Sequence, residues 1–346
     1  PGLKRLRRDL GEMRFLDPAC GSGNFLVVAY RQMRALDLKI LTRLQDLGDT
    51  SEIPALFFTK TDLPVTLDHF AGIEIEEWPA RIAQTALHLA DHQANQQMEL
   101  ALGKAPEPLP LDKVNTIHIG NALRTDWETI FHPNPNVYIM GNPPFIGQSF
   151  KDIDQKEDLQ AVWGKHYTGY LDYVTGWYKK AADYYQYTPA GQFAFVSTNS
   201  IAQGEPVEAL FRPLFEAGWR IFFAHQTFAW SSEAPGMAHV HAVIIGLEKG
   251  RNTTPRLFTY PDINAAPVEV PARHINNYLI DAPTIFISQR RTPLANLPRT
   301  TFGNMPRDGG NLIVEAEEYD TIAADPIAAK YLRPYKMGRE LIHNTP

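Results

Sequence analysis

Short apolar runs alternate with longer segments of helical periodicity over most of the chain. The run at 13–18 ends in a glycine-rich turn at 19–23, and residues 24–44 then repeat apolar positions at helical spacing. A second apolar run ends at Ile75, and a long helical pattern extends from Trp78 to about residue 99. Two successive strand-helix units predict a mostly parallel sheet with helices on both faces.

The alternation continues to about residue 250. It predicts strands at 114–119, 136–140 and 192–197, a tyrosine-rich helix at 171–187 and a helix at 206–217. The stretch between two further apolar runs, 219–224 and 240–247, lacks helical periodicity, so we expect these runs to pair as antiparallel neighbours at a sheet edge. Beyond Gly250, recurring prolines and glycines predict an irregular extension. The predicted organisation is one α/β domain over 1–250 and an extension over 251–346.

Composition narrows the class of protein. The chain has 346 residues, a net charge of −6 and one cysteine. A single cysteine excludes a disulfide framework and a thiolate metal site, and no apolar run is long enough to span a membrane. We therefore expect a cytoplasmic protein without a metal site, in which His225, His239 and His241 are structural. The negative charge disfavours broad electrostatic binding of nucleic acid by this chain alone.

The first candidate motif is the segment DPACGSGNF at 17–25. Asp17 ends a strand, and two glycines then let the backbone turn sharply and approach a ligand before a helix begins. A third glycine of the dinucleotide fingerprint would fall at Leu26, and no Gly-Lys-Ser/Thr of a phosphate-binding loop occurs, which disfavours NAD and ATP. Glu74 ends the next apolar run and is placed to accept bonds from ribose hydroxyls. Its alternative role is to cap the helix that begins near Trp78.

The second candidate motif is Asn-Pro-Pro-Phe at 142–145, directly after an apolar run. Two consecutive prolines cannot continue a central strand, so the chain leaves the sheet here with a fixed geometry. The side-chain oxygen of Asn142 and the carbonyl of Pro143 can then converge on one planar amino group, and Phe145 offers a face for a stacked ring. The alternative is a simple strand stop. Both motifs follow parallel strands, where open α/β sheets bind ligands.

Together these motifs resemble those of class I S-adenosylmethionine-dependent DNA methyltransferases that modify exocyclic amines. The resemblance implies a Rossmann-like α/β fold with a mostly parallel seven-stranded sheet, helices on both faces and an antiparallel edge strand. It also implies S-adenosylmethionine as the cofactor. The order of the motifs is similar to the gamma arrangement of adenine-N6 enzymes.

The resemblance also assigns roles by position. It implies cofactor binding by Asp17, Ala19, Gly21, Gly23 and Glu74, and binding of the target amino group by Asn142, Pro143, Pro144 and Phe145. Asn121 falls where the family usually has an Asp that contacts the adenine amino group of the cofactor. An Asn can accept that bond through its oxygen, although its amide can also adopt the flipped orientation.

Three strings are similar to those of single-chain restriction-modification enzymes of the MmeI type. They are NPPFIGQ at 142–148, FAWSSEA at 228–234 and FGNMPRDGG at 302–310. Such enzymes join an N-terminal nuclease domain, a methyltransferase domain and a C-terminal target-recognition domain. The resemblance implies a methyltransferase domain at 1–250 and an extension at 251–346 that leads toward a recognition domain, with both flanking domains outside this chain. Double-stranded DNA is then the expected partner, bound weakly by this chain alone.

The implied reaction is methyl transfer to the exocyclic N6 of a flipped-out adenine. Asn142 and Pro143 would position the amino group toward the sulfonium methyl. Methylation of cytosine C5 would need a cysteine nucleophile in the second motif, and the one cysteine, Cys20, lies in the first. Cytosine-N4, guanine-N2 in RNA and protein glutamine remain alternative acceptors. A non-catalytic cofactor-binding or docking module is the alternative from another functional class.

Overall fold

A computed structural model describes most of the chain. The described residues are 2–54, 58–59, 62–106, 116–147, 149–230, 240–288, 290, 292, 295, 308–336 and 338–343. The chain divides into two units, residues 1–289 and 290–346. The second unit contains α7 (Ala316–Ala323) and α8 (Gly338–His343). The first contains the sheet and every residue to which the sequence assigned a ligand role.

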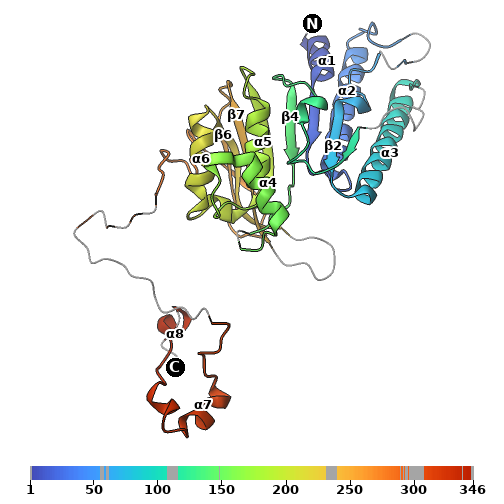
Figure 1. Ribbon diagram of the computed structural model, residues 1–346. Helices are drawn as coiled ribbons and strands as arrows, with labels where there is room; N and C mark the ends of the chain where they lie inside the picture. Colours follow the sequence, from blue (N-terminus) through green and yellow to red (C-terminus); the bar gives the residue numbers. More distant parts are fainter. Residues whose placement is uncertain are drawn as a thin grey trace. The chain divides into compact units, whose positions relative to one another are not determined.

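The first unit is built on one mixed sheet (Figure 1). In the described part of the chain its nine strands have the spatial order β3-β2-β1-β4-β5-β7-β6-β8-β9. They are β1 (Arg14–Asp17), β2 (Phe70–Glu74), β3 (Ile117–Ile119), β4 (Val137–Gly141), β5 (Gly191–Thr198), β6 (Arg220–Trp230), β7 (Val240–Lys249), β8 (Arg256–Thr259) and β9 (Val268–Pro271). The strands from β3 to β5 are parallel. The predicted α/β class with a mostly parallel core is therefore confirmed.

The predicted strand number of seven is wrong. β6 and β7 pair as antiparallel neighbours, as expected, but β8 adds to β6 and β9 adds to β8. The antiparallel pair therefore lies inside the sheet, and β9 forms its edge. Both added strands have four residues and lie after Gly250 among recurring prolines, which indicated irregular structure. Proline is tolerated at the end of an edge strand such as β9, where Pro271 lies.

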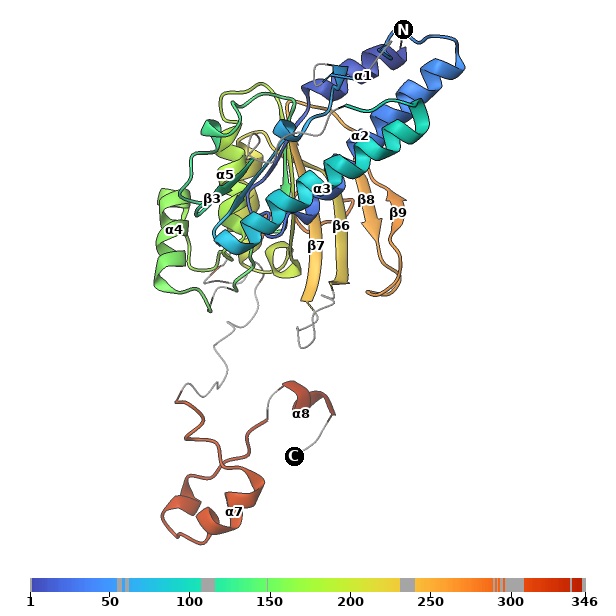
Figure 2. The same ribbon diagram turned by 90° about the vertical axis from the view of Figure 1, so that its right-hand side faces the viewer.

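Helices cover the two faces of this sheet. One face carries α1 (Gly2–Glu12), α2 (Asn24–Asp46) and α3 (Glu77–Leu102), and Figure 2 shows α2 and α3 side by side. Helices α4 (Ile153–Trp163), α5 (Thr175–Tyr184) and α6 (Pro206–Glu216) lie on the other side (Figure 1). Short 3-10 turns occur at Leu67–His69, Trp127–Thr129, Gly164–His166, Asn199–Ala202 and Ala328–Lys330. None of the described helices is long and apolar enough to cross a membrane.

The aromatic residues of α5 fill the core between this helix and the central strands. Tyr178 is fully buried, and its ring packs edge-on against Phe193 and Phe195 of β5. Its hydroxyl lies 2.9 Å from the Ser197 hydroxyl, which satisfies both polar groups in the core. This packing fixes α5 against β5, next to the end of β4.

We predict that Leu16→Ala destabilises the first unit by about 2–5 kcal/mol, because it leaves a cavity at a fully buried position in the central strand β1. The free energy of unfolding in urea measures this loss. Leu100→Ala is the matched control, because Leu100 of α3 is 88% exposed and its truncation should change stability by less than about 0.5 kcal/mol. Equal effects of the two substitutions would contradict the assignment of the core.

Candidate ligand site at the carboxyl ends of the strands

The glycine-rich turn joins β1 to α2 as the sequence predicts. Gly21 and Gly23 adopt left-handed backbone angles, with φ of 53° and 84°. A side chain at Gly23 would place its Cβ 2.9 Å from the Cβ of Ala83 in α3. Glycine at this position is therefore required both for the backbone angle and for the close packing of α2 and α3.

Asp17 ends β1 in a fully buried position. Its Oδ1 accepts a hydrogen bond from the Ala19 amide at 3.0 Å, while its Oδ2 has no hydrogen-bond partner among the described residues. Burial raises the pKa of Asp17 to about 7, the Ala19 amide opposes this shift, and the negative charge of Glu74 adds to it. The buried, unpaired Oδ2 can accept a hydrogen bond from a ligand.

Glu74 ends β2 and contacts the same turn. Its Oε2 accepts from the Gly21 amide at 2.9 Å, and its Oε1 accepts from the Glu76 amide at 3.0 Å. Glu76 is the residue immediately before α3, so Glu74 also binds a main-chain amide at the start of this helix, as the alternative helix-capping role predicted. One carboxylate thus holds the glycine turn and the start of α3, and each oxygen retains a lone pair for a further donor.

The Asn-Pro-Pro-Phe segment leaves the sheet at the end of β4, next to Asp17. β1 and β4 are parallel neighbours, and a side chain at Gly141 would collide with the Asp17 carboxyl. The Oδ1 of Asn142 is buried and has no partner among the described residues. Pro143 is buried, Pro144 is exposed, and Phe145 is half-buried against the core. Two unpaired acceptor oxygens, Asp17 Oδ2 and Asn142 Oδ1, therefore lie at the ends of neighbouring strands.

Asn121 follows β3 and is held by a residue that the sequence did not single out. Its amide nitrogen donates to Asp158 Oδ2 at 2.8 Å, and its Oδ1 accepts from the Leu123 amide at 2.9 Å. The two contacts together select one of the two possible orientations of the Asn121 amide, the one with its nitrogen toward Asp158. Burial raises the pKa of Asp158, but donors that include Arg124, Asn121 and Tyr173 outweigh it and keep the pKa below its ordinary value.

Asp172 is a second residue that sequence reasoning missed. It lies just before α5, and its Oδ1 accepts from the Ile146 amide at 3.0 Å, directly after the Asn-Pro-Pro-Phe segment. Burial raises the pKa of Asp172. No local spacing signalled the contacts of Asp158 and Asp172 with the predicted site, because Asn121 lies 37 residues from Asp158 and Ile146 lies 26 residues from Asp172.

All ten predicted ligand residues lie at or just beyond the carboxyl ends of β1 to β4. The side-chain atoms there that can still accept hydrogen bonds are carboxylate and amide oxygens. Such oxygens suit amines and hydroxyls as ligands. Within the described residues, no group of three or more His, Cys, Asp and Glu side chains can hold a metal ion. Residues 231–239 and 296–307, which include His239 and parts of two MmeI-like strings, lie outside the described residues, as does Gln148.

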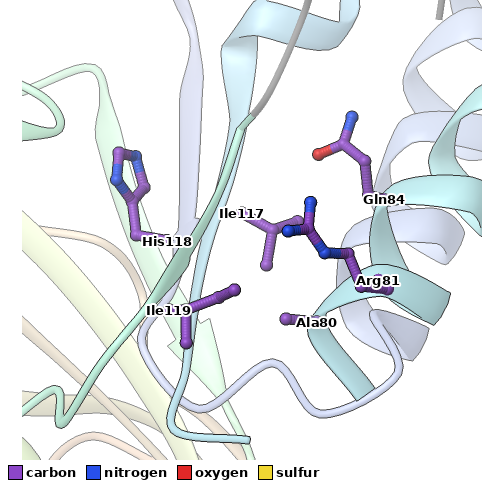
Figure 3. A pocket seen from close by; sticks show the side chains of 6 residues that line it. All are labelled: Ala80, Arg81, Gln84, Ile117, His118 and Ile119. Carbon is purple, nitrogen blue, oxygen red and sulfur yellow. The ribbon is translucent and has the colours of Figure 1, made fainter. Parts of the chain in front are cut away.

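A separate pocket of about 240 Å³ lies beside the edge strand β3 (Figure 3). Arg81 and Gln84 extend from α3 toward Ile117, whereas His118 points to the other side of the strand. None of the ten predicted ligand residues lines this pocket. It is therefore distinct from the site at the strand ends.

Comparisons with known proteins give the families and chains to which this chain is similar. The family model of the MmeI DNA-methyltransferase domain matches residues 1–259, and that of the MmeI target recognition domain matches residues 281–346. DNA methyltransferase A of Bacillus subtilis (strain 168) is 36% identical over 347 aligned positions, which cover 99% of this chain and 38% of that protein.

One solved structure is similar over nearly the whole chain. The type IIL restriction-modification enzyme MmeI in complex with DNA is 39% identical, with a TM-score of 0.88. The match covers 99% of this chain and 46% of that protein. The chain thus spans less than half the length of both relatives.

We predict a pH-dependent effect of Asp17→Asn on the ligand-free protein. Between pH 4 and 7 an unfolded chain releases the Asp17 proton that the folded protein retains, so the cost of ionising the buried carboxyl lowers wild-type stability until the pH exceeds about 7. The variant has no such cost. Its free energy of unfolding relative to wild type should therefore rise by about 2–3 kcal/mol between pH 5 and pH 8.

Urea denaturation at both pH values measures this difference. Asp9→Asn, on the exposed side of α1, controls for the loss of one negative charge. A difference between Asp17→Asn and wild type that stays constant with pH would contradict the raised pKa.

Proposed function

This chain belongs to the MmeI DNA-methyltransferase family, and from that membership we propose that it transfers a methyl group from S-adenosylmethionine to the exocyclic N6 of adenine in DNA. The methylation would form part of a restriction-modification system that acts in the cytoplasm. The observation that carries the proposal is the buried Asn142 Oδ1, which has no partner among the described residues and lies at the end of β4, the parallel neighbour of β1. An acceptor oxygen without a partner of its own supports the proposed role of Asn142 in binding the target amine.

The residues around the glycine turn fit the proposed cofactor. Asp17 Oδ2 would accept from the ammonium group of the methionine portion, because it is buried and no described residue donates to it. Because Gly21 and Gly23 carry no side chains, the ligand could approach the backbone of the turn at 19–23 closely. Glu74 would accept hydrogen bonds from the ribose hydroxyls. Asn121, with its amide oriented by Asp158, would face the adenine ring. When bound, S-adenosylmethionine supplies an electrophilic methyl group on a sulfonium.

The Asn142–Phe145 turn would bind the acceptor base. The amino nitrogen of adenine is a weak nucleophile, because its lone pair is delocalised into the ring. Acceptance of its two hydrogens by Asn142 Oδ1 and the Pro143 carbonyl favours a pyramidal nitrogen whose lone pair is directed toward the methyl group. Phe145 would stack on the base after it leaves the duplex. No covalent bond to the enzyme is required.

The proposed partner is double-stranded DNA. The match of residues 281–346 to the target-recognition family supports DNA contacts in the second unit, and we propose that a nuclease domain of the same parent protein completes the system. Cytosine-N4 presents a similar amino group and is the nearest alternative acceptor. Family membership favours DNA over guanine-N2 in RNA or protein glutamine, and over a non-catalytic docking role.

Mass spectrometry of nucleosides tests the reaction. DNA incubated with the natural full-length protein and S-adenosylmethionine should gain N6-methyladenine, whereas DNA incubated without the cofactor should not. Appearance of N4-methylcytosine instead would replace adenine by cytosine as the acceptor. The absence of any methylated base in DNA, together with tight cofactor binding, would support the docking alternative.

We predict that Asn142→Ala lowers the methylation rate by at least about 100-fold, because it removes one of two acceptors aimed at the reacting nitrogen. Its thermal unfolding should stay within a few degrees of wild type, since Asn142 Oδ1 makes no hydrogen bond within the described protein. Asn252→Ala, at an exposed position, is the matched control and should retain full activity. Retained methylation by Asn142→Ala would refute the assigned role.

A further inference from the structure

The turn that would bind the base is fixed at both of its ends. Before it, Gly141 pairs with Phe195 of β5 as the last residue of the parallel ladder. After it, the Ile146 amide donates to Asp172 Oδ1 at 3.0 Å, and the Ile146 carbonyl accepts from the Tyr173 amide at 3.3 Å. Both main-chain polar groups of Ile146 are therefore used to hold the end of the turn.

Asp172 also belongs to the start of α5, and this is its simplest structural role. Its Oδ1 accepts from the Val174 amide at 3.2 Å, and its carbonyl accepts from the Thr175 amide at 3.0 Å. These bonds satisfy main-chain groups at the helix start. The bond to Ile146 does not, because that amide lies 26 residues earlier in the chain. One buried carboxylate thus joins the helix to the turn.

The segment just before Asp172 is itself held in place. Lys151 is 4% exposed, and its ammonium group donates to the carbonyls of Leu171 and Gly169. Asp172 is 5% exposed. A buried carboxylate whose flanking backbone is fixed on both sides can hold its partner amide in one position.

Asn142 needs such support because its side-chain oxygen receives none from the residues that the structure describes. Its Oδ1 has no hydrogen-bond partner within the described part of the chain, so its direction depends on the backbone on either side. We propose that Asp172 is a positioning residue for the Asn142–Phe145 turn: by binding the Ile146 amide it fixes where the Asn142 and Pro143 oxygens point. This proposal rests on the proposed function, in which those oxygens bind the acceptor amine. A displacement of about 1 Å at a reacting centre lowers a rate by about 100-fold.

The test compares Asp172→Ala, Asp172→Asn and wild type in the natural full-length protein. Asp172→Ala should lower kcat for DNA methylation by about 100-fold, while the Kd for S-adenosylmethionine changes by less than about threefold, because the turn around Gly21 is untouched. Asp172→Asn should recover most of kcat, since its amide oxygen can accept the same two amide bonds. A recovering variant also keeps the test valid if Asp172→Ala folds poorly.

Asp152→Ala is the matched control. Asp152 caps α4 by accepting from the Gln155 amide at 2.8 Å, so its loss removes a helix-start carboxylate that has no bond to the turn. It should lower Tm and leave kcat unchanged. If Asp172→Ala lowers only Tm, as Asp152→Ala does, Asp172 is a helix cap and the positioning role is overturned.

Hydrogen exchange separates this proposal from the proposed function. In Asp172→Ala the Ile146 amide should exchange at least about tenfold faster than in wild type, whereas in Asp152→Ala its exchange should be unchanged. If the wild-type protein methylates no substrate, the proposed function fails. If the exchange rate of the Ile146 amide is the same in Asp172→Ala and wild type, the positioning role of Asp172 fails, whatever the methylation result.

Discussion

Asp17 Oδ2 and Asn142 Oδ1 are two buried oxygens that have no hydrogen-bond partner among the described residues, and the rest of the site is arranged around them. Leaving such a group unpaired costs about 1–3 kcal/mol, so a fold retains it only where neighbouring residues hold it in place. Here β1 and β4 bring the two residues to adjacent strand ends, and the lack of a side chain at Gly141 makes room for the Asp17 carboxyl. The fold thus maintains two acceptors that are ready for donors outside the chain.

The segment 172–177 connects the first motif, Asn121 and the second motif. Trp177 donates to the Pro18 carbonyl at 2.9 Å, and Tyr173 donates to Asp158, which also binds Asn121. Asp172 binds the end of the Asn142–Phe145 turn. The six consecutive residues 172–177 therefore contact the first motif at Pro18 and the residue after the second motif, Ile146. They contact Asn121 indirectly, through the carboxylate of Asp158. Because α5 is packed into the core through Tyr178, these contacts share one rigid support.

The sequence predicted those parts of the fold and site whose signals are local. The glycine turn, the acidic residue that ends each of the first two strands and the proline pair can be identified from neighbouring residues, and the structure brings them to one edge of the sheet. β8 and β9 were missed because strands of four residues among prolines carry no periodicity. Asp158 and Asp172 were missed because a hydrogen bond between residues 26 or 37 positions apart leaves no pattern in a single sequence.

The charge of the site also bears on what it can bind. The start of a helix after a glycine turn ordinarily favours an anion such as a phosphate. Here Asp17 and Glu74 flank that turn, and burial together with the charge of Glu74 already raises the pKa of Asp17. A second negative charge would be repelled by the same effects, whereas a cationic group would stabilise the ionised carboxyl. The two acidic residues therefore make this turn unfavourable for an anion and favourable for a positively charged ligand, and Glu74 retains acceptor capacity for hydroxyl groups.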